Sequence, residues 1–444
     1  MSRREDTFGK YIKSVFRNWK GKIWFFLNMF FTIMYLMWRT FFTIPFGEGV
    51  VSVVAGISLL VVEILGMVEA FVHYANMYSV EDYPFPENIP PEEFPDVDIF
   101  VATYSEPVDL LYKTLRGCTR MKYPDKGKVH IYLCDDGHRE EMKALAMRLG
   151  VNYLDREDHA GAKAGNLNNA LAHSNSPYVV TFDADMIPRS NFLMRTIPYF
   201  VDCDLRNRDK KEEDQVKLGF LQSPQSFYNL DLFQFNLYSE QRIPNEQDYF
   251  YKDIQVARTR TNSVIYGGSN TVLRRKALED IGGFYTKAIT EDFATGILME
   301  KKQYVSLGTS EPLASGLSPQ DLKDLIQQRV RWARGVIATG RKMHIFTSPD
   351  LTFSQKMNYW ASIWYWYAPL KRLIYFLSPI LYATFNFMVL KCTLPQVLLF
   401  WLPMYISSNI SLRMLSRNIR STKWTSIYET VVFPYMLIPV LLES

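Results

Sequence analysis

The N-terminal part of the chain is strongly apolar. Residues 24–46 are almost wholly apolar, and a short turn at residues 47–49 separates them from a second apolar run over residues 50–73. Each run is long enough to cross a bilayer whose hydrocarbon core is about 30 Å thick. Basic residues precede the first run and predict a cytoplasmic N-terminus, so the two runs should form a transmembrane hairpin that returns the chain to the cytoplasm.

The middle of the chain has a different pattern. Residues 77–96 hold five prolines and several acidic residues, which is typical of an extended linker. Beyond them, short apolar runs alternate with amphipathic segments. The predicted strands are 97–103, 129–134, 151–154 and 178–182, and the predicted helices are 107–120, 138–149 and 162–172. This alternation predicts a mostly parallel α/β sheet with helices on both faces.

After residue 341 the chain becomes aromatic and apolar again. Residues 353–367 carry three tryptophans among tyrosines, which predicts a helix at the membrane surface. Residues 373–390 and 394–412 are each just long enough to span a bilayer. Residues 424–442 are apolar but hold one glutamate and two prolines, so we expect an interfacial or re-entrant helix there.

The pattern divides the chain into five parts. They are a basic cytoplasmic tail (1–22), a transmembrane hairpin (23–76), a proline-rich linker (77–96), a cytosolic α/β domain (97–345) and a final group of interfacial and transmembrane helices (346–444). We therefore expect a multi-pass protein of the plasma (inner) membrane, in contact with the lipid bilayer, whose α/β domain faces the cytoplasm.

Composition agrees with this division. Charged residues make up 22% of the chain, aromatic residues 15%, and the net charge is +4. These values fit a globular chain with membrane segments and argue against a nucleic-acid partner. The four cysteines include no C-x-x-C pair, which argues against a zinc site or disulfide framework and fits a reducing compartment. A charged stretch at residues 203–217 is predicted to be a surface loop.

Three ionisable residues fall within or near the ends of the first two apolar runs: Arg39, Glu63 and Glu69. An ionisable side chain inside a membrane is a functional candidate, because its burial there is costly. Two interpretations stay open. The residues pair with one another or reach the membrane surface, or Glu63 or Arg39 faces a polar conduit.

Polar motifs follow three of the predicted strands. They are Tyr104-Ser105-Glu106-Pro107, Asp135-Asp136-Gly137 and Asp183-Ala184-Asp185. Ligands of parallel sheets bind outside the carboxyl ends of the strands, so these motifs mark a candidate site. The two carboxylates of the third motif suit Mg²⁺ or Mn²⁺ held through a diphosphate. The alternative is a surface turn for the third motif and a turn with a glycine corner for the second.

Two further motifs open predicted helices. Lys163 lies at the start of one helix, where backbone amides and a lysine side chain favour anions. Thr290-Glu291-Asp292 begins another. This motif is either an N-terminal cap or the source of a carboxylate that removes a proton from a hydroxyl group.

One further group of candidate residues lies in a predicted amphipathic helix. Gln328, Arg331 and Trp332 are spaced i, i+3 and i+4, so they share one helix face. A planar guanidinium suits phosphate oxygens, and an indole offers a flat apolar surface to a sugar ring. The alternative is a surface helix with scattered positive charge and a half-buried tryptophan.

Taken in order, these motifs resemble the D, D-x-D, T-E-D and Q-x-x-R-W series of processive family 2 glycosyltransferases, most closely that of the bacterial cellulose synthase catalytic subunit. The resemblance covers about residues 97–370. Five secondary stretches agree with it: residues 103–107, 162–166, 222–224, 268–275 and 314–319. It implies a GT-A type domain inserted between transmembrane helices and an inverting transfer from a UDP-sugar, with UDP-glucose favoured.

The resemblance also implies roles for individual residues. Thr103, Tyr104, Glu106 and Asp136 would lie around the uridine, and Asp135 and Lys163 beside the nucleotide and its phosphates. Asp183 and Asp185 would bind Mg²⁺ or Mn²⁺ together with the nucleotide-sugar. Asp292, next to Glu291, would be the catalytic base. Gln328, Arg331 and Trp332 would line the diphosphate and the acceptor sugar, which is the end of the growing polysaccharide.

The likeness stops in two places. The family usually has a gating loop with an F-x-V-T core followed by two more spanning helices, and often a cyclic-di-GMP-binding domain of the PilZ type. Neither is found here, so the chain is either truncated or regulated otherwise. More membrane subunits or a homo-oligomer would then be needed to complete a conduit.

Several functions remain compatible with these residues. A β-glucan synthase is the first, and the synthesis of hyaluronan, chitin, poly-N-acetylglucosamine or a differently linked glucan is the second. Glycosylation of a lipid carrier is a third, although such enzymes usually lack Q-x-x-R-W. A catalytically silent subunit of an export complex is the fourth.

Overall fold

The computed structural model describes residues 2–78, 80, 83–238, 242–416, 419 and 421–443, with side chains from Trp19 onward. The basic side chains predicted for residues 3–17 lie outside that set. The chain forms two compact units. The helical unit holds the described residues up to 80 and from 361 to 442, and the sheet unit holds those from 83 to 360 together with residue 443.

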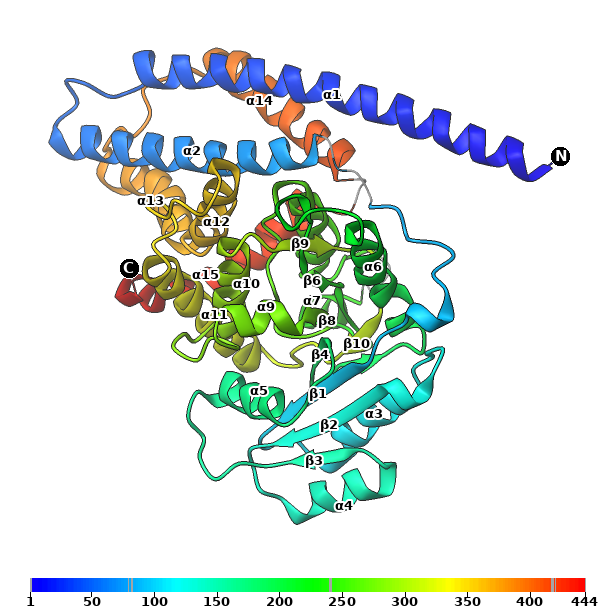
Figure 1. Cartoon of the computed structure of the whole chain (residues 1–444). Coiled ribbons are helices and arrows are strands. Elements are labelled where there is room, and N and C mark those ends of the chain that lie inside the picture. Colours follow the sequence, from blue (N-terminus) through cyan, green and yellow to red (C-terminus); the bar gives the residue numbers. More distant parts are fainter. Residues whose placement is uncertain are drawn as a thin grey trace. The chain divides into compact units, whose positions relative to one another are not determined.

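The sheet unit is built on a seven-stranded sheet of order β3-β2-β1-β4-β8-β6-β9 (Figure 1). Its strands are β1 Val97–Thr103, β2 Val129–Asp135, β3 Asn152–Leu154, β4 Tyr178–Asp183, β6 Leu218–Gln222, β8 Thr271–Arg274 and β9 Val305–Gly308. A second sheet has the order β5-β10-β7, with β5 Ile187–Pro188, β10 Ala314–Gly316 and β7 Gln225–Phe227. In the large sheet only β8 runs antiparallel to its neighbours, so the predicted mostly parallel sheet is confirmed.

Helices cover both faces of the large sheet, as the alternating pattern predicts. They are α3 Val108–Thr119, α4 Glu140–Leu149, α5 Ala162–Ala172, α6 Phe192–Asn207, α9 Arg275–Asp280 and α10 Glu291–Lys301. Successive strand residues point to opposite faces. Ile99, Val101 and Val180 therefore join one core with α3, α4 and α6. Phe100 and Val179 join a second core with α5, α9 and α10.

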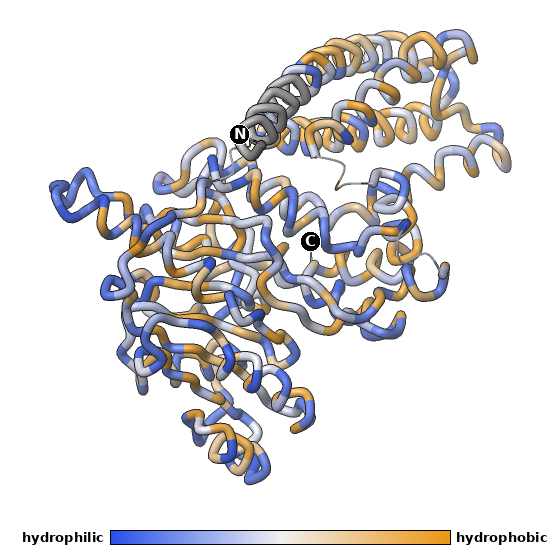
Figure 2. Tube along the Cα trace, turned by 90° about the vertical axis from the view of Figure 1, so that its right-hand side faces the viewer, coloured by the Kyte–Doolittle hydropathy of each residue, from blue (hydrophilic) through white to orange (hydrophobic). Residues whose placement is uncertain are grey.

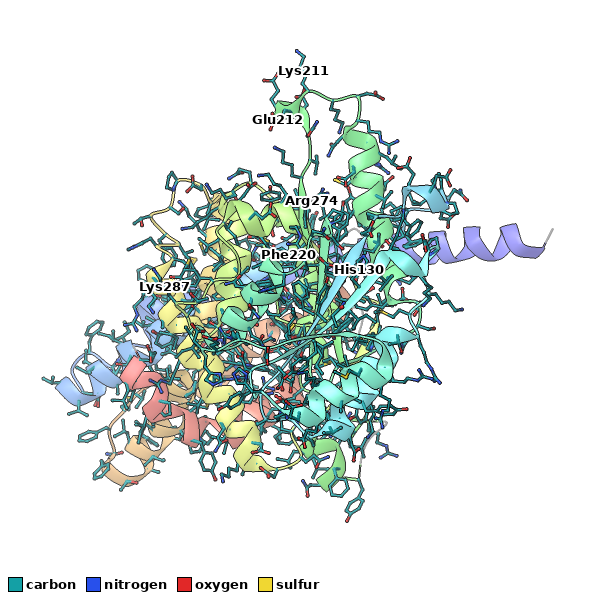
Figure 3. The ribbon with its side chains drawn as sticks, turned by 60° about the horizontal axis from the view of Figure 1, so that its bottom comes forward. His130, Lys211, Glu212, Phe220, Arg274 and Lys287 are labelled. Atoms are coloured by element: carbon teal, nitrogen blue, oxygen red, sulfur yellow. The ribbon has the colours of Figure 1, made fainter. Side chains whose placement is uncertain are left out.

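Further helices follow in the sheet unit. They are α7 Leu232–Asn236, a π-helical turn at Phe250–Ile254, α8 Gln255–Arg258, α11 Leu322–Lys342 and α12 Phe353–Tyr365. The last of them, α12, continues past residue 360 into the part of the chain assigned to the helical unit. Short 3₁₀ turns lie at Pro91–Glu93, Lys126–Lys128, Glu212–Asp214 and Thr259–Thr261. The charged stretch at 203–217 is partly helical, since α6 continues to Asn207. Beyond it the chain is an exposed loop with Lys211 and Glu212 at its outer end, whereas Phe220 is buried within the sheet (Figure 3).

Strand register brings the predicted polar motifs to one edge of the sheet. Thr103 at the end of β1 lies opposite Asp135 at the end of β2, and Ala102 lies opposite Asp183 at the end of β4. The residues before these ends are buried apolar side chains, so packing on both faces sets the register. The motifs at the ends of β1, β2 and β4 are therefore neighbours in space.

The helical unit contains α1 Ser2–Phe42, α2 Val50–Met77, α13 Ala368–Phe385, α14 Leu394–Leu415 and α15 Thr422–Glu443. Helix α1 is continuous with the predicted polar tail and ends before Pro45, and Gly47 and Gly49 take positive φ angles in the following turn. Hydrophobic colours dominate its described part in Figure 2.

Among the described residues, three helical segments are long and apolar enough to cross a membrane: Trp19–Phe42, Val50–Met77 and Thr422–Glu443. The first two agree with the predicted hairpin. The third segment corresponds to the helix expected at residues 424–442, and its length and composition are those of a span, so its interfacial or re-entrant position stays a prediction.

The predicted spans at 373–390 and 394–412 do not qualify by the same measure. Helix α13 begins and ends five residues earlier than predicted. It includes Lys371 and Arg372, and it stops at Asn386, which has a left-handed backbone. Helix α14 starts as predicted but contains Gln396, Ser407 and Asn409, which lower its apolar character.

The ionisable residues of the apolar helices have partners within the helical unit. Arg39 is fully buried and its Nε donates to Glu63 Oε2 at 2.8 Å, while the Tyr35 hydroxyl donates to Glu63 Oε1 at 2.9 Å. Glu69 pairs with Lys371 at 2.7 Å. Arg39 and Glu63 therefore pair with each other, as one of the two interpretations predicts, whereas Glu69 has its partner in α13.

Candidate active site

The D-x-D motif begins where β4 ends, and a neighbouring loop fixes its first aspartate. The Asp183 amide donates to Ser269 Oγ at 2.9 Å. The side chain of Gln222 holds this loop in turn, because it accepts from the Gly267 amide at 2.8 Å and donates to the Ser269 carbonyl at 2.9 Å. The Gln222-Ser223-Pro224 and Gly267-Gly268-Ser269-Asn270 stretches thus form one support for Asp183.

Lys163, in the first turn of α5, forms an ion pair with the Asp183 carboxylate. Its Nζ also donates to the Gly268 carbonyl at 3.1 Å. Burial alone would lower the pKa of Lys163, but the negative charges of Asp183 and Glu291 raise it overall. Lys163 is therefore a firmly charged cation at the carboxyl edge of the sheet, suited to a phosphate group.

The second aspartate of the motif is held from another direction. Asp185 Oδ2 accepts from the Leu317 amide at 3.0 Å, just after β10. Burial first, and then the charge of Asp183, raise the pKa of Asp185 to about 6. A half-buried carboxylate whose pKa is raised by a neighbouring carboxylate is an arrangement that a divalent cation can relieve.

The residues present fit such a cation only in part. Within the described ranges, no group of three or more His, Cys, Asp or Glu side chains is placed to hold a metal ion. Asp183 and Asp185 would therefore need oxygen ligands from a bound molecule to complete the shell. A diphosphate supplies oxygens of this kind, and Mg²⁺ is commonly held by one or two carboxylates plus substrate phosphates.

Asp292 approaches the same loop from the first turn of α10. Gly268 has a φ of 76°, and a Cβ atom there would lie 2.8 Å from Asp292 Oδ2 and 3.4 Å from Lys163 Nζ. A glycine is required by both the backbone angle and the close approach. Asp292 and Lys163 therefore meet at one peptide unit, although 129 residues separate them in the sequence.

The environment of Asp292 favours its neutral form. Burial is the largest cause and the charge of Glu291 the second, and together they raise the pKa of Asp292 to about 7. Lys163 acts in the opposite direction. A carboxylate with such a pKa can accept a proton near neutral pH, which is what a general base needs.

The helix that carries the Q-x-x-R-W motif packs against the start of α10. Thr290 Oγ1 lies 3.2 Å from Thr339 Oγ1 of α11, and a Cβ at Gly335 would lie 2.4 Å from Thr290 Cγ2. Thr290 occupies the N-cap position of α10, as one alternative predicts, but its side chain makes no capping hydrogen bond. It instead packs the T-E-D motif against α11, one turn beyond Trp332.

Gln328, Arg331 and Trp332 all lie in helix α11, as predicted, and their side chains differ in exposure. Arg331 is exposed, whereas Gln328 and Trp332 are half-buried. Gln328 Oε1 is buried without a hydrogen-bond partner among the described residues, so it can accept a hydrogen bond from a ligand hydroxyl. The Arg329 guanidinium, which the predictions did not include, lies 4.5 Å from the centre of the Trp332 ring.

Comparison with known proteins decides the family. The model of "Glycosyl transferase family group 2" matches residues 178–408, slightly more than half of the chain. The chain belongs to this glycosyltransferase family. The match begins at β4 and includes the D-x-D, T-E-D and Q-x-x-R-W motifs.

Relatives of this glycosyltransferase include bacterial cellulose synthases. The chain is 32% identical over 412 residues to the cellulose synthase 1 catalytic subunit (UDP-forming) of Komagataeibacter xylinus, covering 93% of this chain and 53% of the relative. It is 30% identical over 416 residues to the cellulose synthase catalytic subunit (UDP-forming) of Pseudomonas fluorescens, covering 94% and 54%. The chain thus spans about half the length of these curated relatives.

A solved structure supports the fold. A mannosyltransferase of Pyrobaculum calidifontis in complex with GDP-Man and Mn²⁺ superposes with a TM-score of 0.60 at 16% identity, over 88% of this chain and 98% of that one. At this identity the likeness concerns the fold alone. It agrees with the GT-A type α/β fold predicted from the sequence.

The glycosyltransferase also has carboxylates on the β1 and β2 side of the site, and these are held by the protein itself. Asp135 pairs with Arg139 at 2.9 Å, and Asp136 pairs with Arg156 at 2.6 Å. Arg156 further donates to the Ala160 and Ala162 carbonyls at 2.7 and 2.9 Å, which orders the loop that leads to Lys163. The sequence analysis did not single out these two arginines, of which Arg139 lies four residues after its partner and Arg156 twenty residues after its partner.

Glu106 folds back on its own turn. Its carboxylate accepts from the Thr103 hydroxyl at 2.7 Å and from the Tyr104 amide at 2.8 Å. Burial would raise the pKa of Glu106, but these hydrogen bonds lower it overall. Tyr104 itself is exposed, and its ring lies edge-on to His159 with the two ring centres 5.8 Å apart. Thr103, Tyr104 and Glu106 are therefore one turn at the end of β1.

Tyr251 is a central residue that the sequence did not reveal. It is buried in the π-helical turn, and its hydroxyl would lie 3.2 Å from a Cβ at Gly267. Burial first, then the charges of Asp292 and Asp183, raise its pKa, while Arg329 lowers it. The pKa of Tyr251 is thus affected by a charged residue of the T-E-D motif, one of the D-x-D motif and one of the Q-x-x-R-W motif. In the sequence, Tyr251 is marked only by the run of aromatic residues at 249–251. Such a run more often indicates residues of the hydrophobic core than of a functional site.

Proposed function

We propose that this glycosyltransferase is a processive, inverting enzyme of the membrane, which transfers glucose from UDP-glucose to a growing β-glucan and passes the polymer across the bilayer. The observation that carries the proposal is the meeting of Lys163 and Asp292 at Gly268, beside Asp183. A cation suited to phosphate and a carboxylate with a raised pKa thus approach the same glycine, which supports the proposal. The similarity to cellulose synthase subunits supports glucose as the sugar.

The donor would lie along the carboxyl edge of the sheet. The turn of Thr103, Tyr104 and Glu106, together with Asp136, would contact the uridine, and Asp135 and Lys163 the nucleotide and its phosphates. Asp183 and Asp185 would hold Mg²⁺ or Mn²⁺ together with the diphosphate. When bound, that ion neutralises charge that develops on the departing UDP.

The acceptor would enter from the side of α11. Trp332 would stack on the terminal sugar, Gln328 would accept a hydrogen bond from one of its hydroxyls, and Arg331 would face the diphosphate. Asp292 takes the proton of the attacking hydroxyl while that oxygen bonds to the anomeric carbon. The bond between this carbon and the UDP oxygen breaks at the same time, so the configuration inverts.

The test of catalysis uses the full chain in membranes. We expect UDP release from UDP-glucose with Mg²⁺ or Mn²⁺, and a loss of about 10²–10⁴ in rate for Asp292→Asn. The substitution keeps the size of the side chain and removes the base. Equal inactivity of wild type and variant with every UDP-sugar would favour a catalytically silent subunit instead.

The test of the sugar and its linkage uses the product. A panel of UDP-sugars is supplied and any polymer is digested with glycosidases of known linkage. We expect consumption of UDP-glucose and digestion by a β-glucanase. Consumption of only UDP-N-acetylglucosamine or UDP-glucuronate would move the proposal to another polysaccharide.

A further inference from the structure

We propose that Arg329 and Glu246 form a positioning pair for Trp332, and that this pair makes the indole a platform with a single free face for the acceptor sugar. The inference rests on the proposed function, because it assigns the acceptor to Trp332. Arg329 occupies an unspecified position of the Q-x-x-R-W motif, so the motif alone gives it no role.

The first observation is the stacking of Arg329 on Trp332. The two residues are spaced i and i+3 on α11, which places them on adjoining parts of the helix surface. The guanidinium carbon lies 4.5 Å from the centre of the indole ring, within the range of a cation–π contact. One face of the indole is therefore covered by a planar cation.

The second observation is that Arg329 is held in place. Its Nη2 pairs with Glu246 Oε1, and both side chains are largely buried, with exposed fractions of 14% and 10%. A buried ion pair restricts the guanidinium much more than a solvated one does. The indole consequently rests on a cation whose own position is set by another segment.

That segment is itself anchored. The Glu246 amide donates to Asp231 Oδ2 at 3.3 Å, and Gln234 Nε2 donates to the Ile243 carbonyl at 2.8 Å. Asp231 and Gln234 form the capping box that starts α7. A chain of contacts therefore runs from α7 through Glu246 and Arg329 to Trp332.

The consequence concerns the sugar. A pyranose ring stacks on a flat apolar face, and Trp332 is half-buried with one face already occupied. The acceptor thus has the opposite face to bind, so the side of the ring from which its hydroxyl approaches Asp292 is determined. A tryptophan without Arg329 could turn, and water would then compete with the acceptor for the donor.

The experiment measures coupling as well as rate. Full-length Arg329→Gln and Glu246→Gln are compared with wild type for UDP released, glucose incorporated into polymer and the KM of a β-linked gluco-oligosaccharide acceptor. We expect a roughly threefold to tenfold rise in acceptor KM, in keeping with a cation–π contact at a half-buried site. The ratio of UDP released to glucose incorporated should rise, and the KM for UDP-glucose should stay within about twofold.

Two further variants separate positioning from folding. Arg329→Lys keeps a charge for Glu246 but loses the planar group, so it should fold like wild type and show part of the uncoupling. The exchange Glu246→Arg with Arg329→Glu restores an ion pair but places a carboxylate over the indole, so it should not restore coupling. Lys323→Gln, at an exposed position near the start of α11, is the matched control and should behave like wild type.

The outcomes separate two failures. If wild type makes polymer and Arg329→Lys, Arg329→Gln and Glu246→Gln all keep its acceptor KM and its UDP-to-glucose ratio, the positioning pair is refuted and the function stands. Full rescue by the exchanged pair would also refute it, since a structural ion pair would then suffice. If wild type consumes no UDP-sugar, both the proposed function and this inference are refuted.

Discussion

The surroundings of Asp292, the proposed base, set its pKa. Burial and the adjacent Glu291 oppose its ionisation, whereas Lys163 favours it, and the balance brings its pKa to about 7. These groups come from two segments of the sheet unit, the first turn of α5 and the first turn of α10. The pKa of Asp292 beside Gly268 thus depends on opposing charges, and the contribution of each charged side chain can be tested by substitution.

The first prediction concerns pH. The base must be deprotonated to act, so kcat/KM for UDP release should rise as pH increases through about 7 and level off above it. Glu291→Gln removes a neighbouring charge that raises the pKa, so its profile should shift to lower pH. Steady-state rates over about pH 5.5–8.5 at constant ionic strength measure both. A Glu291→Gln profile that coincides with the wild-type profile would contradict this assignment of cause.

The second prediction concerns the metal. Because two carboxylates are an incomplete shell, Mn²⁺ should bind at least about tenfold more tightly when UDP is present than when it is absent. Asp185→Asn should weaken Mn²⁺ binding in both conditions. Calorimetric titration of Mn²⁺ gives these values without any turnover. Equal affinity with and without UDP would indicate a site completed by protein ligands instead, and chelation by EDTA should stop UDP release.

The packing of two helices sets the distance between Asp292, the proposed base, and Trp332, the proposed acceptor platform. Helix α10 carries Asp292 in its first turn and helix α11 carries Trp332, and the two meet where Thr290 packs on Gly335 and Thr339. The contact has no room for a larger side chain. It therefore fixes the spacing of two motifs that are about forty residues apart in the sequence.

The third prediction tests this contact. Gly335→Ala places a methyl group against Thr290, and overpacking of this kind typically costs about 1–3 kcal/mol. We expect a lower unfolding temperature together with a loss of kcat, because the start of α10 must move. Thr290→Ser removes the nearest methyl group and should partly restore both in the double variant. Thermal unfolding and UDP release measure the two effects, and Gly66→Ala in α2, where a Cβ would meet nothing within 4 Å, is the control.

At the scale of the elements, the sequence predicted β1 to β4 of the large sheet, but not β6, β8 and β9 or the side-chain contacts between distant segments. Alternating buried runs gave β1, β2 and β4 and placed their polar motifs at one edge. Arg329, Glu246 and Tyr251 remained hidden because a cation–π contact, a buried ion pair and a buried phenol depend on tertiary packing. The end of α13 was also misplaced, since the left-handed turn at Asn386 leaves little trace in an apolar sequence.

The whole molecule combines a sheet unit that carries the site with a helical unit that carries apolar spans. Within the helical unit, the ion pairs of Arg39 with Glu63 and of Lys371 with Glu69 join segments distant in sequence. Charges paired in this way can be accommodated in a membrane at a lower cost than single ones. These pairs argue for a fixed packing of the apolar helices.

The fourth prediction concerns membrane topology. If the basic N-terminus is cytoplasmic, the turn at residues 47–49 faces the other side of the membrane. A Glu48→Cys variant, with Cys392→Ser to remove a half-buried native thiol, should react with an impermeant maleimide in intact cells. A cysteine at Lys211, in the exposed loop of the sheet unit, should react only after lysis. The reverse result would place the site outside the cytoplasm, away from a supply of UDP-sugar.

The alignment of the ends of β1, β2 and β4 has a consequence for insertions and deletions. Removing one residue from the middle of β4 would exchange its inward and outward faces, so Val179 and Val180 would each point toward the wrong core. Removing two would keep the faces but draw Asp183 back by about 7 Å. We therefore expect these strands to tolerate neither insertions nor deletions. Length variation in this enzyme should be confined to its loops.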